Sequence, residues 1–60
     1  MPRKQLNEEE FQKMTKGKKL TQPEEAILRQ VCGLPHNKTL VPPEGVLYER
    51  LWMRAWKKIS

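Results

Sequence analysis

The strongest structural signal in this chain is residues 46–60, VLYERLWMRAWKKIS. On a helix of 3.6 residues per turn, they separate into an apolar face and a basic face. The apolar face carries Leu47, Tyr48, Leu51, Trp52, Ala55, Trp56 and Ile59. The opposite face carries Arg50, Arg54 and Lys57, which recur every three or four positions. This pattern predicts an amphipathic helix over about residues 45–59, with one face for a core and one for a partner.

The segment before this helix allows two interpretations. Residues 33–45, GLPHNKTLVPPEG, hold three of the five prolines and two of the three glycines. A turn at the Pro-Pro-Glu-Gly sequence between two apolar runs would make a β-hairpin. An isolated two-stranded hairpin is marginal in water, and Leu47 and Tyr48 fit the helical face equally well. We therefore expect a Pro-rich loop before the helix, with an α+β fold containing a short hairpin around residues 38–48 as the alternative.

Residues 21–35, TQPEEAILRQVCGLP, predict a second helix with clear ends. Thr21 and Glu24 have the spacing of a capping box, and a proline is tolerated in the first turn. Gly33 suits the position just after a helix, where a left-handed conformation is common, and the proline beyond it prevents continuation. We expect a helix over about residues 22–32. Its apolar stripe should face a core and contains Ile27, Leu28, Val31 and Cys32.

A first helix is expected over about residues 8–16. Asn7 is suited to cap its start, and Glu10 stands at the third helical position, as in a capping box. Gly17 should end this helix in a turn that carries three lysines. These are Lys16, Lys18 and Lys19.

Length and composition favour a single small all-α domain, 1–60, in which the C-terminal helix packs across the other two. A chain of sixty residues buries only about 60% of its unfolded surface, so it is marginally stable alone. Cys32 is the one cysteine, which excludes a disulfide within the chain. Cys32 and His36 together are too few for a zinc site, and we expect no metal and no cofactor. Helix packing, association as a homodimer or docking on a larger partner must provide stability.

The charge of the chain favours an anionic partner. Twelve basic residues against seven acidic ones give a net charge of +5. Residues 1–20 and 46–60 are both basic, the segment between them is slightly acidic, and we expect residues 1–6 to be a flexible basic arm. This balance suits nucleic acid or an acidic protein surface. The N-terminus lacks the apolar region of a secretory signal, so we expect an intracellular protein, cytoplasmic or associated with the nucleoid.

The residues needed for catalysis are missing. The chain has no Asp, a single Ser at position 60, one His and one Cys, so a Ser-His-acid triad is implausible. The three glycines are scattered and make no phosphate-binding loop. We therefore expect a protein that is not an enzyme.

Nucleic-acid binding is the first functional hypothesis. The two N-terminal helices have the spacing of a helix-turn-helix, but the second begins with Glu24 and Glu25, whose carboxylates would be repelled by phosphates. The C-terminal helix is a better candidate for the element that binds DNA or RNA. The protein would then have a regulatory or accessory role, for example in transcription regulation. The residues expected to contact phosphates are Arg50, Arg54, Lys57, Lys16, Lys18, Lys19, Arg3 and Lys4.

A protein–protein interaction module is the alternative hypothesis. Trp, Tyr and Arg are favoured at the energetic centres of interfaces, and the C-terminal helix is rich in them. Such a protein would be an inhibitor of a larger enzyme or a small subunit of a large assembly. The side chains expected at its interface are Trp52, Trp56, Met53 and Tyr48. An anionic membrane surface is a third partner, which the two capped upstream helices disfavour because they indicate a folded domain.

Overall fold

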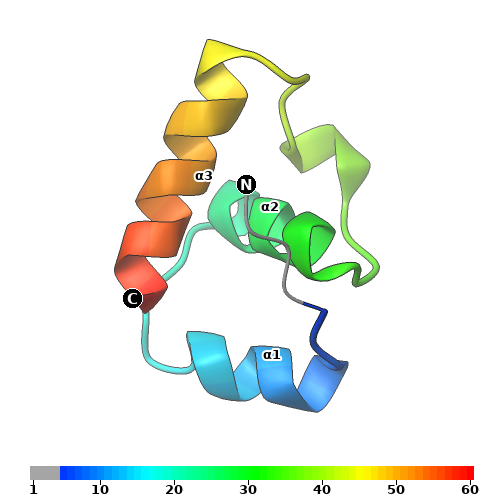
Figure 1. The fold of residues 1–60 in the computed structure, drawn as a ribbon, viewed down its shortest axis with the longest axis vertical. Coiled ribbons are helices and arrows are strands. Elements are labelled where there is room, and N and C mark those ends of the chain that lie inside the picture. The colour runs from blue at the N-terminus through cyan, green and yellow to red at the C-terminus, as the bar shows by residue number, and fades with distance from the viewer. Residues whose placement is uncertain (1–4) are drawn as a thin grey trace.

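The computed structural model describes residues 5–60, which form three α-helices and one short 3-10 helix. The helices are α1 Glu8–Thr15, α2 Gln22–Cys32, η1 Lys38–Leu40 and α3 Val46–Ile59. In Figure 1, α2 lies in the middle of the molecule, α1 lies on one side of it and α3 runs across another. The predicted all-α fold is confirmed, and each predicted helix begins and ends within one residue of the observed one.

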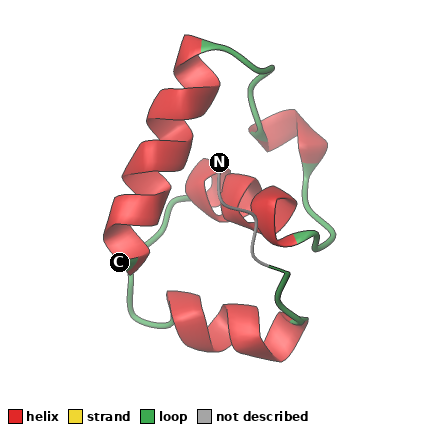
Figure 2. Cartoon of the chain, in the orientation of Figure 1, coloured by secondary structure: helices red, strands yellow, loops and turns green. Residues whose placement is uncertain are grey.

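The alternative of a hairpin around residues 38–48 is wrong. Figure 2 shows helices and loops but no strand in the described part of the chain. Asn37 turns the chain into η1, because its side chain accepts a hydrogen bond from the Thr39 backbone N–H at 3.0 Å. The Asn37 carbonyl also accepts from the Leu40 N–H at 3.1 Å. These local bonds use backbone groups that a strand would need for pairing, and α3 begins directly after Gly45.

Both N-terminal helices begin with the predicted capping boxes. Asn7 Oδ1 accepts from the Glu10 backbone N–H at 2.8 Å. At the start of α2, the Thr21 backbone N–H donates to Glu24 Oε1 at 2.9 Å. Gly33 ends α2 with φ of 78°, a left-handed conformation that costs a glycine little. The bounds of α2 therefore follow from local hydrogen bonds that the sequence pattern predicts.

The core lies where α1 and α3 meet α2. Its buried side chains are Phe11, Ile27, Leu28, Cys32, Tyr48 and Ala55. Partly buried apolar side chains surround them, including Met14, Leu51, Trp52, Trp56 and Ile59. The expectation that Leu47 faces this core is wrong, since its side chain is 70% exposed. Leu47 belongs to the first turn of α3, which extends beyond α2 (Figure 1).

Arg29 of α2 joins three parts of the molecule. Its guanidinium makes two hydrogen bonds to the Glu8 carboxylate of α1, at 2.6 and 2.9 Å. The same group lies 4.9 Å from the centre of the Phe11 ring, within the range of a cation–π contact. It also donates to the Pro35 carbonyl at 3.4 Å in the loop after α2. Arg29 therefore fixes α1 and the Pro-rich loop against the central helix.

Candidate binding surface on the C-terminal helix

The face of α3 that packs against α2 is fixed by two buried side chains. Ala55 is fully buried and Tyr48 is 7% exposed. The Tyr48 hydroxyl donates to Gln30 Oε1 of α2 at 2.9 Å. Tyr48, expected from the sequence at a partner interface, instead belongs to the core.

A row of cations lies on the opposite face of α3. Arg50, Arg54 and Lys57, which we call the basic strip, are all exposed. Within residues 5–60, none of the three forms an ion pair. Helical geometry places Arg50 and Lys57 about 10 Å apart along the axis. The strip is therefore a line of positive charge that faces solvent.

Other cations of the chain are held by carboxylates. Arg29 is paired with Glu8, and the hydrogen bond that the guanidinium donates to that carboxylate is the largest of the effects that raise the pKa of Arg29. Lys58 Nζ lies 2.7 Å from Glu24 Oε1, and Lys13 Nζ lies 3.7 Å from Glu9 Oε1. These pairs neutralise the charge of Arg29, Lys58 and Lys13, whereas the three cations of the basic strip have no such partner among the described residues.

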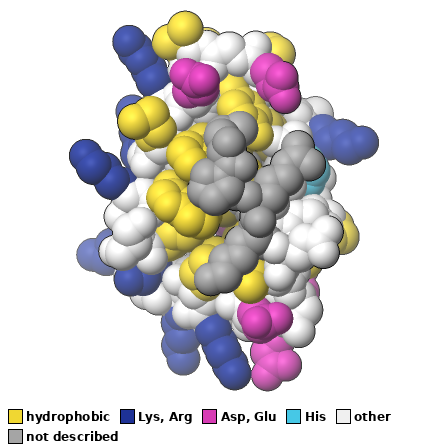
Figure 3. Space-filling view, viewed as in Figure 1, with side chains coloured by type: hydrophobic (Ala, Val, Ile, Leu, Met, Phe, Trp, Pro, Cys, Tyr) yellow, Lys and Arg dark blue, Asp and Glu magenta, His cyan; other side chains and the backbone are white. Residues whose placement is uncertain are grey.

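The turn between α1 and α2 adds three more exposed cations, Lys16, Lys18 and Lys19. None of them forms an ion pair among the described residues. This turn lies beside the C-terminal end of α3 (Figure 1), because the ion pair of Lys58 with Glu24 holds the last turn of α3 at the start of α2. In Figure 3, Lys and Arg side chains gather along one edge of the molecule, over α3 and the turn. The structure thus brings most of the predicted phosphate contacts together.

Arg3 and Lys4 were also predicted as phosphate contacts. Both lie outside the described residues.

Two indole rings border the basic strip. Trp52 and Trp56 are stacked, with ring centroids 5.6 Å apart and an angle of 8° between the ring planes. Met53, which is 61% exposed, lies between these rings and Lys57 around the helix. A groove of ≈ 600 Å³ runs over this face. It is lined by Arg50, Trp52, Met53, Arg54, Trp56, Lys57 and Ser60, and no Asp or Glu side chain is among them.

Glu24 is the residue that positions the end of α3. Its side chain is 1% exposed, although it carries a carboxylate. Burial by itself would raise the pKa of this carboxyl, but the hydrogen bonds from Lys58 and Thr21 outweigh burial and lower the pKa below its ordinary value of 4.5. Glu24 therefore remains charged at neutral pH and holds Lys58 by charge as well as by a hydrogen bond.

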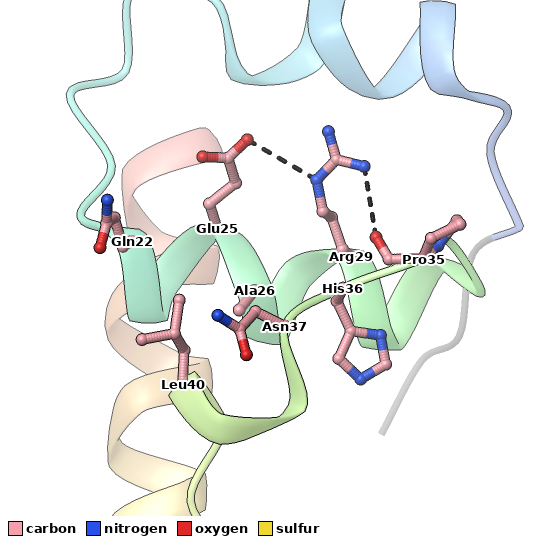
Figure 4. Close-up of a pocket in the computed structure, with 8 residues that line it drawn as sticks. All are labelled: Gln22, Glu25, Ala26, Arg29, Pro35, His36, Asn37 and Leu40. Carbon is pink, nitrogen blue, oxygen red and sulfur yellow. Dashed lines mark hydrogen bonds and ion pairs between the residues drawn. The ribbon is translucent and has the colours of Figure 1, made fainter.

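A second hollow lies on the far side of α2 and has a volume of ≈ 510 Å³. Figure 4 shows that its polar groups come from α2 and from the loop before η1. Arg29 Nε lies 3.6 Å from Glu25 Oε1, and a terminal nitrogen of Arg29 donates to Pro35 (Figure 4). His36 Nδ1 lies 3.1 Å from the Leu34 carbonyl. The charged groups of this hollow are already paired with one another, so it offers less to a ligand than the groove on α3.

The residues with metal-binding or nucleophilic chemistry are dispersed. The described residues contain no group of three His, Cys, Asp or Glu side chains that could hold a metal ion. Cys32 is buried in the core. None of the described helices is long and apolar enough to cross a membrane. The groove and the basic strip are therefore the strongest candidate site.

Comparison with known proteins finds no relative. No family model matches the chain, and no significant match is found among curated proteins or solved structures. The function is therefore inferred from the surface itself.

Proposed function

We propose that this chain is a small, non-enzymatic nucleic-acid-binding protein with a regulatory or accessory role. The basic strip of α3 and the Lys-rich turn beside it would bind phosphates of DNA or RNA. The observation that carries the proposal is that these cations are exposed and unpaired among the described residues, whereas Arg29 and Lys58 are held by carboxylates. An intracellular location, in the cytoplasm or at the nucleoid, is part of this proposal.

The spacing of the strip suits a phosphate backbone. Arg50 and Lys57 are about 10 Å apart along α3, a distance that covers about three nucleotides of one strand at 3.4 Å each. Arginine binds a phosphate through two parallel N–H groups, which gives direction as well as charge. The turn with the exposed Lys16, Lys18 and Lys19 lies beside the C-terminal end of α3 in Figure 1 and would continue the row of cations beyond the helix.

The structure supports α3 over α2 as the binding helix. α2 is the central helix, and the start of α2 contains the buried Glu24 and the half-exposed Glu25. A helix whose first turn carries two carboxylates is repelled by phosphates, and Glu24 is already bound to Lys58. Binding through a helix-turn-helix formed by α1 and α2 is therefore disfavoured.

Charge removal tests the proposal. Fluorescence anisotropy with labelled duplex and single-stranded oligonucleotides would compare the wild type with the variant R50Q/R54Q/K57Q. We expect the variant to bind about tenfold or more weakly, since it loses three phosphate contacts. The double variant R50Q/R54Q and the matched control K13Q/K38Q each remove two exposed cations, the first from the strip and the second from other parts of the surface. The control should bind within about twofold of the wild type. Equal weakening in the two double variants would mean that net charge matters and the strip does not, which contradicts the proposal.

A protein-docking role is the second candidate. It is favoured by the exposed apolar side chains of α3, because Val46 is 66% exposed and Leu47 is 70% exposed. An inhibitor of a larger enzyme or a subunit of an assembly would pack these apolar side chains against its partner, and the basic strip would favour a partner with an acidic surface. A homodimer through the basic strip would bring like charges together. We therefore expect any dimer to form through Val46 and Leu47. Sedimentation of the wild type and of Leu47→Asp tests this, since only a dimer docked there would dissociate in the variant.

A further inference from the structure

We propose that the groove on α3 binds unpaired bases, so that the protein prefers single-stranded nucleic acid to duplex. This inference rests on the proposed function and names its substrate class. It comes from Trp52, Met53 and Trp56, which phosphate binding alone does not use.

The groove combines charge with flat aromatic surface on one helix. Arg50, Arg54 and Lys57 share its lining with the two indoles. At 100° per residue, Met53 lies about 40° from Lys57 and about 60° from Trp56 around α3. A chain whose phosphates follow the basic strip would therefore place its bases toward Met53 and the indoles.

The indole pair has the geometry of a stack that a base can extend. The two rings are nearly parallel, at 8°, and their centroids are 5.6 Å apart, as in offset stacking of aromatic rings. Both side chains are partly buried against the core, which fixes the rings in place. A rigid aromatic platform loses little entropy when a base stacks on it, and stacking tolerates every base because each has a flat face.

A duplex does not fit this surface equally well. In a duplex the base faces are covered by their neighbours, and a protein reads base edges with polar side chains such as Asn, Gln and Arg. Here the centre of the exposed face of α3 carries Met53, which is 61% exposed and offers no strong hydrogen-bonding group. Single strands expose base faces beside a phosphate backbone, and positively charged grooves with aromatic side chains are the usual way to bind them.

The charge of the groove also selects its occupant. Its lining holds three cations and no Asp or Glu side chain, which favours a polyanion over an apolar ligand. An acidic peptide satisfies the charge but supplies no series of flat rings, so the stacked indoles favour the oligonucleotide.

Tryptophan fluorescence tests the inference directly, because both tryptophans of the chain line this groove. The full chain would be titrated with a dT 12-mer, with a 12-base-pair duplex, with inorganic polyphosphate and with poly-glutamate. We expect the dT 12-mer to quench tryptophan emission and to bind on the order of tenfold more tightly than the duplex. Polyphosphate should bind without comparable quenching, because it has charge but no bases.

A variant pair gives the matched control. Trp56→Leu keeps an apolar side chain at the edge of the core and should lose on the order of tenfold in affinity for dT while its affinity for polyphosphate is unchanged. Leu47→Ala removes an exposed apolar side chain of α3 outside the groove and should leave both affinities unchanged. If Trp56→Leu does not fold by circular dichroism, the four titrations of the wild type still decide the question.

Four results would overturn the inference. Equal affinity for duplex and dT, or equal quenching by polyphosphate and dT, would refute base stacking and leave phosphate binding by the strip intact. Absence of binding to any nucleic acid would refute the proposed function as well. Quenching by poly-glutamate with none by dT would assign the groove to an acidic protein partner.

Discussion

Lys58 Nζ lies 2.7 Å from Glu24 Oε1, and this ion pair joins the last turn of α3 to the first turn of α2. The carboxylate is 1% exposed, whereas the lysine side chain is 36% exposed. The same Glu24 oxygen accepts the backbone N–H of Thr21, which caps α2. The cap of α2 thus also holds the last turn of α3, in addition to the buried Tyr48 and Ala55 that fix the packing face of α3.

Loss of Lys58 should destabilise the protein. Lys58→Met leaves the buried Glu24 carboxylate without its charged partner, and we expect a loss of about 1–3 kcal/mol in the free energy of unfolding. Urea denaturation measures this quantity. The control is Lys57→Met, one residue away on the exposed face, which should change stability by less than about 0.5 kcal/mol. Equal effects of the two substitutions would show that the ion pair does not hold α3.

The ion pair should also make stability depend on pH. Hydrogen bonds from Lys58 and Thr21 overcome the effect of burial and place the pKa of Glu24 below its ordinary value of 4.5. A carboxyl whose pKa is lower in the folded state stabilises the fold above about pH 4.5, and this contribution is lost as pH falls through the folded-state pKa. The hydrogen bond from Arg29 lowers the pKa of Glu8 in the same direction.

Thermal unfolding of the wild type and of Lys58→Met from pH 7 to pH 2.5 measures this contribution. The difference in Tm should be largest above about pH 5 and should shrink as Glu24 becomes protonated in both proteins. A difference that stays constant over the whole range would assign the effect of Lys58 to something other than the Glu24 charge.

Arg29 should not be replaceable by lysine. Arg29 makes two hydrogen bonds to Glu8 and lies over the Phe11 ring, and the planar guanidinium makes these contacts together. Arg29→Lys keeps the charge but loses the paired hydrogen bonds. We expect a lower Tm and a lower free energy of unfolding. The contact with the Phe11 ring should account for about 0.5–1 kcal/mol of the loss in free energy. Phe11→Leu should then lower the free energy of unfolding less in the Arg29→Lys background than in the wild type. Equal losses in the two backgrounds would exclude coupling between Phe11 and Arg29.

Local signals in the sequence predicted most of the fold. The capping residues Asn7 and Thr21, and Gly33 at the end of α2, define helix ends through bonds within a few residues of each other. Such bonds depend little on the rest of the chain, so the local sequence is sufficient to predict these helix ends. The expectation of a helix rather than a hairpin rested on the marginal stability of an isolated two-stranded hairpin, because Leu47 and Tyr48 fit a strand and a helical face equally well.

The candidate site was predicted in part. The exposed cations Arg50, Arg54 and Lys57 follow from the helical period alone, since they share one face. The roles of Tyr48, Leu47 and Lys58 depend on how α3 is rotated and how far it extends past α2, which are properties of the packed molecule. The buried Glu24 was predicted only as a cap, because no local pattern shows that a lysine 34 residues later returns to it.

The salt dependence of nucleic-acid affinity shows whether the basic strip contacts phosphate. A plot of log Kd against log salt concentration for the wild type and for R50Q/R54Q/K57Q reports how many phosphates the strip neutralises. We expect the slope to fall by about two to three in the triple variant, at about 0.7 per contact with a single strand and about 0.9 with a duplex. Identical slopes for the two proteins would show that Arg50, Arg54 and Lys57 do not contact phosphate, and would contradict nucleic-acid binding by the strip.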